Sequence, residues 1–306
     1  MRILVTGRSG QVAHCLAEKA GARHELVFAQ RPAFDLLDPR TIERTVAQTC
    51  PDLIFSLAAY TAVDLAESEP DVAMATNADG PALLARAAAR AGAPIIHLST
   101  DYVFDGSNGR PYREEDPVGP LNAYGASKLA GEQAVRDSGA AFAIVRTSWI
   151  YSPFGRNFVK AMLSLAGSGN RLRVVADQLG CPTSAFDVAD GLLRMADLWG
   201  VQRRGLDATY HLVGSGETDW ANFARRIFAF SAACGGPAAA VDDIPSAAYP
   251  SPAKRPANSR LDNSRFAETF GYRPPDWRTS LQPVVARMVA EARRPIHRPA
   301  THPLYP

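Results

Sequence analysis

The chain has 306 residues and 46% of them are hydrophobic, which is enough to bury one large core or two modest ones. Its net charge is only +2, from 33 basic and 31 acidic residues without a basic block, which argues against a nucleic-acid or membrane-surface partner. No apolar run approaches the roughly 20 residues of a membrane span, the start does not resemble a secretion signal, and the 4 cysteines form no CxxC or His-Cys cluster. We therefore expect a cytoplasmic protein with reduced cysteines and no metal site.

The first predicted element is a strand over residues 2–6 that runs into a glycine turn. Gly7, Gly10 and Ala13 are spaced G-x-x-G-x-x-A, and a helical pattern follows them. Glycines let the backbone turn tightly and approach a pyrophosphate, while a helix N-terminus offers free N–H groups and the positive end of its dipole. Strand, glycine turn and helix in this order predict a dinucleotide site, and a plain strand–helix turn is the alternative.

The end of the second predicted strand, residues 25–29, bears on which dinucleotide binds. A site that prefers NAD usually carries Asp or Glu there for the ribose 2′-hydroxyl, whereas this chain has Gln30 and Arg31. A guanidinium can hold a 2′-phosphate through two hydrogen bonds. We predict NADP(H) in preference to NAD(H); a solvated Arg31 and NAD(H) binding are the alternative.

Two further segments of the first half offer contacts to a dinucleotide. Asp35 could accept from the amino group of an adenine while Leu36 packs on its face. The continuously apolar run at residues 52–57 predicts a strand buried on both faces. It ends in the small residues 58–61, where the backbone of a dinucleotide could lie close to the chain.

The stretch with the most chemistry begins at a strand over residues 94–99 that ends in Thr100 and Asp101. Tyr124 and Lys128 follow at i, i+4, which places both on one face of a helix. An ammonium beside a phenol favours the phenolate and lowers its pKa, and a strand-end hydroxyl can share the same substrate oxygen. The set predicts a device for moving a proton to or from a carbonyl. A chance helix-surface pair is the alternative unless a hydride donor also binds.

The polar, Gly- and Pro-rich segment at residues 104–121 is long enough to be a functional flap. A strand over residues 142–149 ends in Trp149, whose indole could line a sugar pocket or fill a core or an interface. The remaining predicted elements are helices over residues 39–48 (N-capped by Asp38), 71–91, 158–165, 187–199, 220–231 and 280–292, and strands over 171–175 and 210–213.

Alternating strands and helices in the first half predict an α/β fold, a Rossmann-like doubly wound parallel sheet with a smaller mixed α/β substrate-binding domain. The expected parts are an NAD(P)-binding domain over residues 1–150 with 171–200 returning to it, a mainly substrate-binding domain over 151–294, and a disordered tail over 295–306. Ligands of such sheets bind at the carboxyl ends of the strands. Gly10, Ala59, Thr100 and Trp149 all fall at predicted strand ends, so one crevice would collect them.

With these residues in view, the chain resembles the extended short-chain dehydrogenase/reductases, and more narrowly the dTDP-4-dehydrorhamnose reductases. The motifs that carry the resemblance are TGRSGQV, HLSTDYVFDG, PLNAYGASKLAGE, RTSWIY and PAKRPANSRLD, and the likeness covers nearly the whole chain. The resemblance implies reduction of the 4-keto group of a dTDP-bound 6-deoxy sugar to dTDP-L-rhamnose. Asp101 is followed by Tyr102 rather than a second acid, which argues against a dehydratase.

The resemblance also implies roles for individual residues. The catalytic set would be Thr100, Tyr124 and Lys128. Together with the contacts inferred above, the cofactor would meet Gly7, Gly10, Gln11, Val12, Gln30, Arg31, Asp35, Leu36, Ala59, Tyr60, Thr61, Leu98, Tyr124 and Lys128. The nucleotide-sugar would meet Thr100, Asp101, Tyr124, Trp149, Asn157 and Arg255, the last two at its diphosphate or thymidine end.

Some family members dimerise through a magnesium ion bound by carboxylates, one of them just after the glycine turn. Here that position is Cys15, so no such metal bridge is expected, and the protein would be a monomer or a homodimer. Two other functions stay open. One is a reductase or epimerase of another nucleotide-sugar, and the other is a non-catalytic NADP-binding regulatory subunit on the same scaffold.

Overall fold

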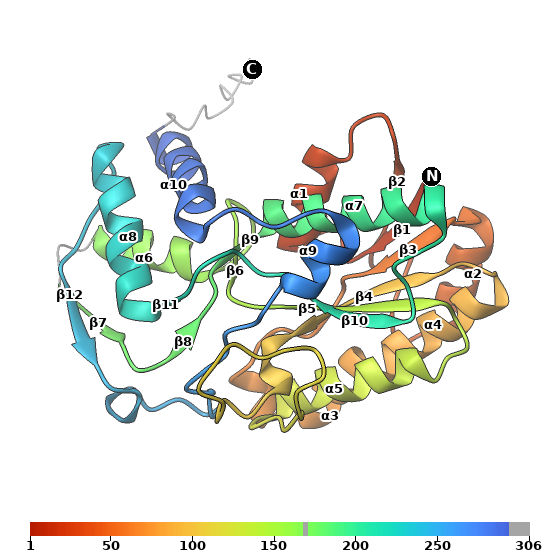
Figure 1. Ribbon diagram of the computed structural model, residues 1–306, viewed down its shortest axis with the longest axis horizontal. Coiled ribbons are helices and arrows are strands. Elements are labelled where there is room, and N and C mark those ends of the chain that lie inside the picture. Colours follow the sequence, from red (N-terminus) through yellow and green to blue (C-terminus); the bar gives the residue numbers. More distant parts are fainter. Residues whose placement is uncertain (168–170, 294–306) are drawn as a thin grey trace, which may run out of the picture.

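The computed structural model describes residues 1–167 and 171–293, and a six-stranded sheet runs through its larger lobe (Figure 1). Every neighbouring pair in this sheet is parallel. In spatial order the strands are β10 (Ala208–His211), β5 (Phe142–Thr147), β4 (Ile95–Thr100), β3 (Leu53–Ser56), β1 (Arg2–Thr6) and β2 (Glu25–Ala29). The predicted doubly wound parallel sheet is confirmed.

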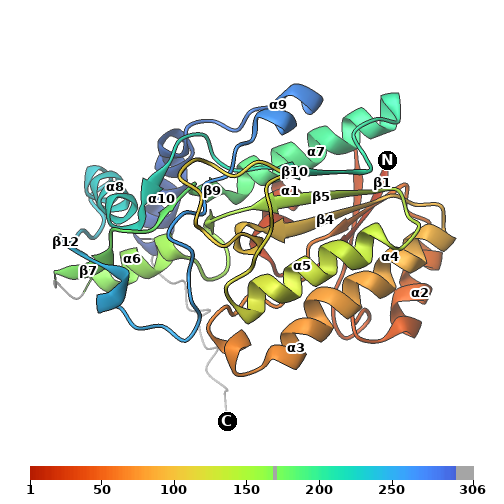
Figure 2. The same ribbon diagram turned by 60° about the horizontal axis from the view of Figure 1, so that its bottom comes forward.

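Helices cover both faces of the sheet, and each face has its own apolar core (Figure 2). One face carries α1 (Gln11–Lys19), α7 (Ala185–Gln202) and α9 (Ser264–Phe270), and the other carries α2 (Pro39–Thr49), α4 (Gly80–Arg90) and α5 (Ala123–Arg136). The Asp38 carboxylate accepts from the Arg40 N–H, so the predicted N-cap of α2 is confirmed. The single helix predicted over residues 71–91 is instead α3 (Pro70–Met74), a π-helical turn (Ala75–Asp79) and α4.

The strand order reverses next to β1, which creates the crevice that ligands of such sheets use. From β1 the chain crosses through α1 to β2 on one side, then returns through α2 to β3 on the other side. No connecting segment therefore passes over the gap between the carboxyl ends of β1 and β3. This is the topological switch point at which doubly wound sheets bind dinucleotides.

A second lobe follows β5 and has a separate core (Figure 1). Its helices are α6 (Phe158–Ala166), α8 (Trp220–Ala233) and α10 (Trp277–Arg293). Its short strands pair as β6 (Ile150–Tyr151) with β9 (Thr183–Ser184), β7 (Leu172–Val175) with β12 (Val241–Ile244), and β8 (Leu179–Gly180) with β11 (Thr218–Asp219). The boundary predicted at residue 150 stays a prediction, and the tail predicted over residues 295–306 lies outside the described residues.

The segment 104–121, predicted to be a flap, is hydrogen-bonded to a distant part of the chain in this structure. The Tyr112 N–H donates to the Arg260 carbonyl at 2.7 Å, and the Asn258 amide donates to the Asn108 and Arg110 carbonyls at 2.6 and 2.9 Å. The Phe104 and Tyr112 rings stack with centroids 4.2 Å apart and are buried. A role as a flap stays a prediction, and these partners, some 150 residues away, could not be inferred from local composition.

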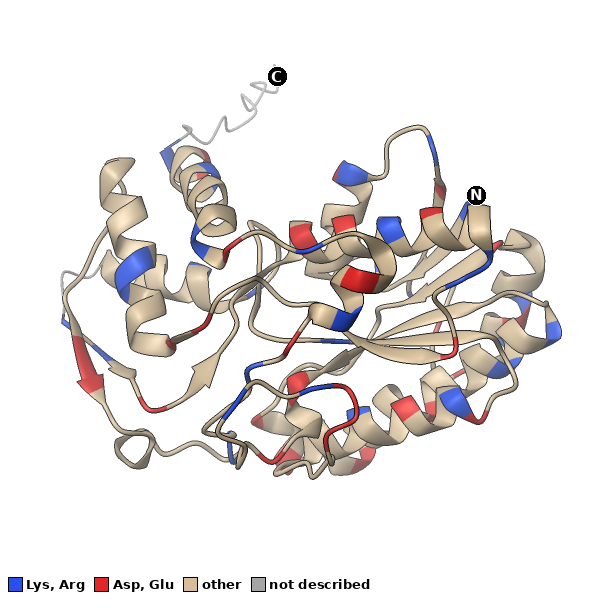
Figure 3. Ribbon diagram, viewed as in Figure 1, with Lys and Arg blue, Asp and Glu red and all other residues tan. Residues whose placement is uncertain are grey.

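Charged residues of both signs alternate over the two lobes, in keeping with the nearly neutral composition (Figure 3). Within residues 1–167 and 171–293, no helix combines the length and apolarity that crossing a bilayer requires.

Candidate active site

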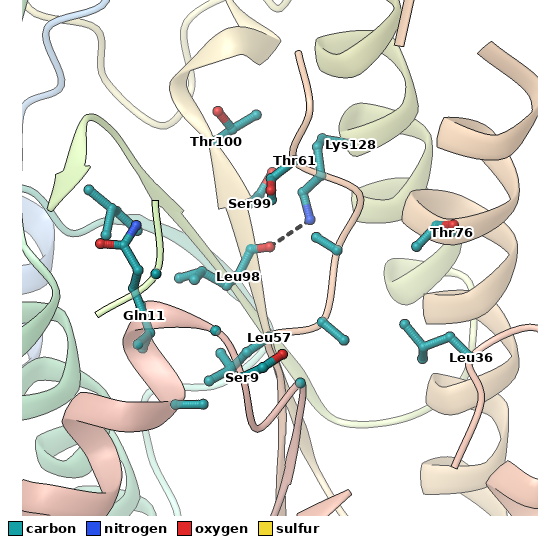
Figure 4. Close-up of a pocket in the computed structure, with 18 of the residues that line it drawn as sticks. Ser9, Gln11, Leu36, Leu57, Thr61, Thr76, Leu98, Ser99, Thr100 and Lys128 are labelled. Carbon is teal, nitrogen blue, oxygen red and sulfur yellow. Dashed lines mark hydrogen bonds between the residues drawn. The ribbon is translucent and has the colours of Figure 1, made fainter. Parts of the chain in front are cut away.

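A cavity of about 830 Å³ opens at the carboxyl ends of β1, β3, β4 and β5 and reaches the first residues of the second lobe (Figure 4). Figure 4 shows Gln11 on one side of it and Leu36 and Thr76 on the other. The lining includes most of the residues predicted from the sequence, namely Gly7, Gly10, Gln11, Val12, Gln30, Arg31, Asp35, Leu36, Ala59, Thr61, Leu98, Thr100, Asp101, Tyr124, Lys128 and Trp149.

The glycine turn after β1 has the geometry of an anion site. Gly7 has φ +83°, and a Cβ there would lie only 3.0 Å from the Ala58 backbone, so a larger residue would be strained and crowded. Gly10 caps α1 in extended conformation without a side-chain hydrogen bond. The N–H groups of the first turn of α1 therefore face the cavity without a side-chain cap, which suits a diphosphate.

Helix α5 is positioned by its N-cap and by a close backbone approach. The Asn122 side chain accepts from the Gly125 N–H at 2.7 Å and donates to the Lys254 carbonyl at 2.9 Å. A Cβ at Gly125 would collide with the Tyr102 carbonyl oxygen, so only glycine lets the helix pack this closely. Cap and contact together hold the first turn, which carries Tyr124, against the end of β4.

Tyr124 and Thr100 both line the cavity and lie close to each other. The Tyr124 hydroxyl lies within hydrogen-bonding reach of Thr100, and the Thr100 hydroxyl also donates to the Asp101 carboxylate at 2.9 Å. Burial raises the pKa of Tyr124 to about 12, although its hydrogen bond to Thr100 works the other way. The phenol therefore stays protonated at neutral pH and can act as a proton donor.

Lys128 has a different orientation from the one expected. Its ammonium donates to the Leu98 carbonyl at 2.7 Å (Figure 4) and lies 3.3 Å from Nε2 of His97. Burial lowers the pKa of Lys128 to about 8. The sequence predicted that this ammonium would lower the pKa of Tyr124. Instead that pKa is raised, because burial dominates and Lys128 is directed to the strand backbone.

Two further predicted substrate contacts, Asp101 and Trp149, line the same cavity. Asp101 is buried, and burial raises its pKa to about 7, so both of its protonation states are accessible near neutrality. Trp149 has a positive φ of 45° and stacks on Trp220 with ring centroids 3.4 Å apart. The residue joins an aromatic cluster in the second lobe, as the packing alternative expected, and it also lines the cavity, while its contact with a sugar stays a prediction.

Tyr60, Asn157 and Arg255, which the sequence also singled out, are not among the lining residues. The Tyr60 hydroxyl donates to Glu69 at 2.8 Å, and Arg255 forms an ion pair with Asp64 at 2.8 Å. Asn157 caps α6 and donates to the Gln11 side chain at 3.0 Å. Their roles toward a ligand stay predictions, and each has a protein partner in this structure.

Several lining residues had not been predicted. Thr147 pairs in register with Thr100 on the adjacent strand, so the rule that ligands meet strand ends could have found it. Arg156 reaches the lining from the turn before α6, and Thr76 from the π-helical turn before α4. Neither of these two has a local sequence signal, since the tertiary fold alone brings them to the cavity.

Cys15, the position considered above for a metal bridge, is part of the protein core. Cys15 is fully buried, and the carboxylates nearby are paired with cations. Glu18 accepts from Arg287 at 2.8 Å, and Asp190 accepts from Lys19 at 2.9 Å. Among the described residues, no group of three or more His, Cys, Asp or Glu side chains is arranged for a metal ion.

Fold and cavity together define a class of protein. A doubly wound sheet, a glycine turn after its first strand, and Thr100, Tyr124 and Lys128 around one cavity are the features of an extended short-chain dehydrogenase/reductase. The protein is an oxidoreductase of this class.

Similar proteins narrow the class to a family. The family model described as the RmlD substrate binding domain matches residues 1–290. The dTDP-4-dehydrorhamnose reductase of Sinorhizobium fredii is 48% identical over 297 residues, which are 96% of this chain and 99% of that one. The chain belongs to the dTDP-4-dehydrorhamnose reductase family.

Solved structures support the same family assignment. A dTDP-4-dehydrorhamnose reductase from Clostridium acetobutylicum superimposes with a TM-score of 0.87 at 35% identity, over 94% of this chain and 99% of that one. A dTDP-4-dehydrorhamnose reductase from Bacillus anthracis, solved in complex with NADP, gives 0.85 at 32% identity, with the same coverage of 94% and 99%.

Proposed function

We propose that the protein reduces the 4-keto group of dTDP-4-dehydro-6-deoxy-L-mannose (dTDP-4-dehydrorhamnose) to the alcohol of dTDP-L-rhamnose, with NADPH as the reductant. The observation that carries the proposal is the meeting of Tyr124, Thr100 and the glycine turn around one cavity. Relatives of 38 to 48% identity bear the name of this activity, and one similar structure contains NADP.

The cavity residues fit a dinucleotide. The uncapped start of α1 suits its diphosphate, and Asp35 and Leu36, which line the same cavity, are proposed for the adenine. Bound there, NADPH supplies the hydride that becomes the new C4 hydrogen of the sugar. Tyr124 gives its hydroxyl proton to the ketone oxygen. Thr100, whose hydroxyl donates to Asp101 in this structure, would turn that donor to the same oxygen and stabilise the charge developing on it. Lys128 lies beside this centre and adds positive charge while it is protonated.

The substrate would lie toward the second lobe. Asp101 and Trp149 line the cavity, Trp149 where it meets the core of the second lobe, and a carboxylate and an indole edge are suitable contacts for sugar hydroxyls. Asn157 and Arg255 are proposed for the diphosphate or thymidine end. Reaching it would require each to exchange its present partner, Gln11 or Asp64, for the ligand.

The direct test follows NADPH absorbance after adding enzymatically prepared dTDP-4-dehydrorhamnose. We expect oxidation of one NADPH for each dTDP-L-rhamnose formed. Turnover without net NADPH oxidation would indicate an epimerase, and activity on UDP-sugars but not on this substrate would indicate another reductase. Tight NADPH binding with no turnover on any of these sugars would indicate the regulatory subunit instead.

Arg31 is expected to set the preference for NADPH over NADH. It lines the cavity, its side chain is exposed, and it has no ion-pair partner among the described residues, so its charge is available to a 2′-phosphate. Replacing Arg31→Leu should raise the Kd for NADPH by roughly 10- to 100-fold, the loss of one charge-assisted contact. The Kd for NADH should change less than about twofold.

Fluorescence titration of both cofactors measures this. The matched control is Arg40→Leu, an exposed arginine on α2 that does not line the cavity and should alter neither Kd. Equal losses for NADPH and NADH in Arg31→Leu would show that Arg31 does not read the 2′-phosphate.

A further inference from the structure

Beneath the cavity, a fully buried histidine lies between Lys128 and the next strand. His97 is on β4 with no exposed surface, and Ser56 is its register partner on β3. Its Nε2 is 3.3 Å from the Lys128 ammonium, and its Nδ1 is 3.1 Å from the Ser56 hydroxyl. The imidazole therefore links the lysine to the interior of the sheet.

The two contacts determine which ring nitrogen carries the proton. An ammonium has only donors, so Nε2 of His97 must be the acceptor toward Lys128. A neutral imidazole with an unprotonated Nε2 carries its hydrogen on Nδ1, and this N–H faces the Ser56 oxygen as donor. A protonated ring would repel Lys128, and burial together with that lysine holds the pKa of His97 well below its ordinary value.

We propose that His97, with its tautomer held by Ser56, is a positioning residue that gives Lys128 a neutral acceptor and keeps it charged and directed along the cavity floor. The inference rests on the proposed reduction and adds a residue to it. The Leu98 carbonyl, the other acceptor, is part of the backbone and is the same in any variant. His97 is therefore the contact at which a substitution can change the pKa and the position of the Lys128 ammonium.

None of the other charged groups around Lys128 replaces His97 as its side-chain acceptor. Glu132, one turn further along α5, is the acid that acts on the lysine, but Arg146 binds it at 2.7 Å and Ser99 donates to it at 2.6 Å. The remaining ionisable groups on α5 and on the elements packed against it are Glu67, Asp71, Asp79, Arg86, Arg90, Asp101, Tyr102, Tyr124 and Arg136. None of these provides Lys128 with a hydrogen-bond acceptor among the described residues.

The chain allows a direct measurement, because its lysines are Lys19, Lys128, Lys160 and Lys254. Protein labelled with ¹³C at the lysine Cε would be titrated by NMR, with the Lys128 signal assigned from a Lys128→Arg variant. The wild-type signal should titrate near pH 8, as burial lowers the Lys128 pKa to about 8. In His97→Phe this pKa should fall by about one further unit, because a charged donor has lost an acceptor.

Kinetics give a second readout. In wild type the alkaline limb of kcat/KM should fall near the Lys128 pKa, and in His97→Phe it should move down by the same unit, with kcat reduced up to about 100-fold from misplacement. His97→Gln, which returns an acceptor near the Nε2 position, should restore much of both. Ser56→Ala removes the acceptor that holds the proton on Nδ1 of His97. It should therefore also lower the Lys128 pKa, but by less than His97→Phe does.

The matched control is His211→Phe, a histidine that is equally buried but bonded to the Tyr112 carbonyl away from the cavity. It should leave the Lys128 titration unchanged. An unshifted titration in both His97→Phe and Ser56→Ala would overturn the inference, and if His97→Phe does not fold, Ser56→Ala and His97→Gln decide it. An inactive wild type with the expected titration shifts would instead contradict the proposed function and leave the lysine–histidine pair standing.

Discussion

Replacing Tyr124→Phe should lower kcat by about 10²- to 10⁴-fold, the usual contribution of a positioned general acid. The phenol lies within reach of Thr100 in the proposed site, and with a pKa of about 12 it carries its proton throughout neutral pH. Stopped-flow or steady-state NADPH oxidation measures the loss. The Kd for NADPH should stay within about threefold, since the ring remains and only the hydroxyl is removed.

Tyr210→Phe is the control, because Tyr210 is a buried tyrosine of β10 that does not line the cavity. Its kcat should be that of wild type. If Tyr124→Phe turned over at a near-normal rate, another group would have to protonate the ketone oxygen, and Asp101 would be the next donor to test because its pKa is raised to about 7.

Replacing Arg146→Met should lower the free energy of unfolding by about 3–5 kcal/mol, the expected loss when a buried ion pair keeps only one partner. Arg146 on β5 and Glu132 on α5 are 3% and 0% exposed and form two hydrogen bonds at 2.9 and 2.7 Å. Without Arg146, the carboxylate keeps only Ser99 and the partly exposed Arg136. Urea denaturation followed by circular dichroism measures the change.

The double variant Arg146→Met, Glu132→Leu should recover most of this stability, because an apolar pair of similar volume replaces the buried charges. An equally unstable double variant would show that packing, not the unpaired carboxylate, causes the loss. Although burial works against it, Arg146 holds the pKa of Glu132 below its ordinary value. The pair's contribution in wild type is therefore present above the unfolded pKa of Glu and is lost as pH falls through the lowered folded pKa.

Local signals were sufficient for most of the fold. The glycine turn, the apolar strands and the Asp38 cap each depend on neighbours in the sequence, and the structure has all of them. The rule that ligands bind at strand ends also predicted that Gly10, Thr100 and Trp149 would line one cavity.

Features that depend on distant partners were not predictable in this way. The segment 104–121 has the composition of a flap, and its hydrogen bonds to Asn258 and Arg260 could not be read from that composition. The Tyr124–Lys128 spacing places both side chains on one helix face without specifying their acceptors. The Leu98 carbonyl and His97 determine where the ammonium lies, and a buried environment raises the Tyr124 pKa that the pair alone would lower.

Gln11 joins the two lobes at the glycine turn. Its side-chain oxygen accepts from Ser152 at 2.7 Å and from Asn157 at 3.0 Å, and both donors belong to the second lobe. Any hinge motion that separates the lobes must break these bonds at the residue that begins α1. Because the start of α1 is also the proposed diphosphate site, opening of the cleft would disturb dinucleotide binding under the proposed function, and dinucleotide binding would bias the lobes with the same coupling free energy.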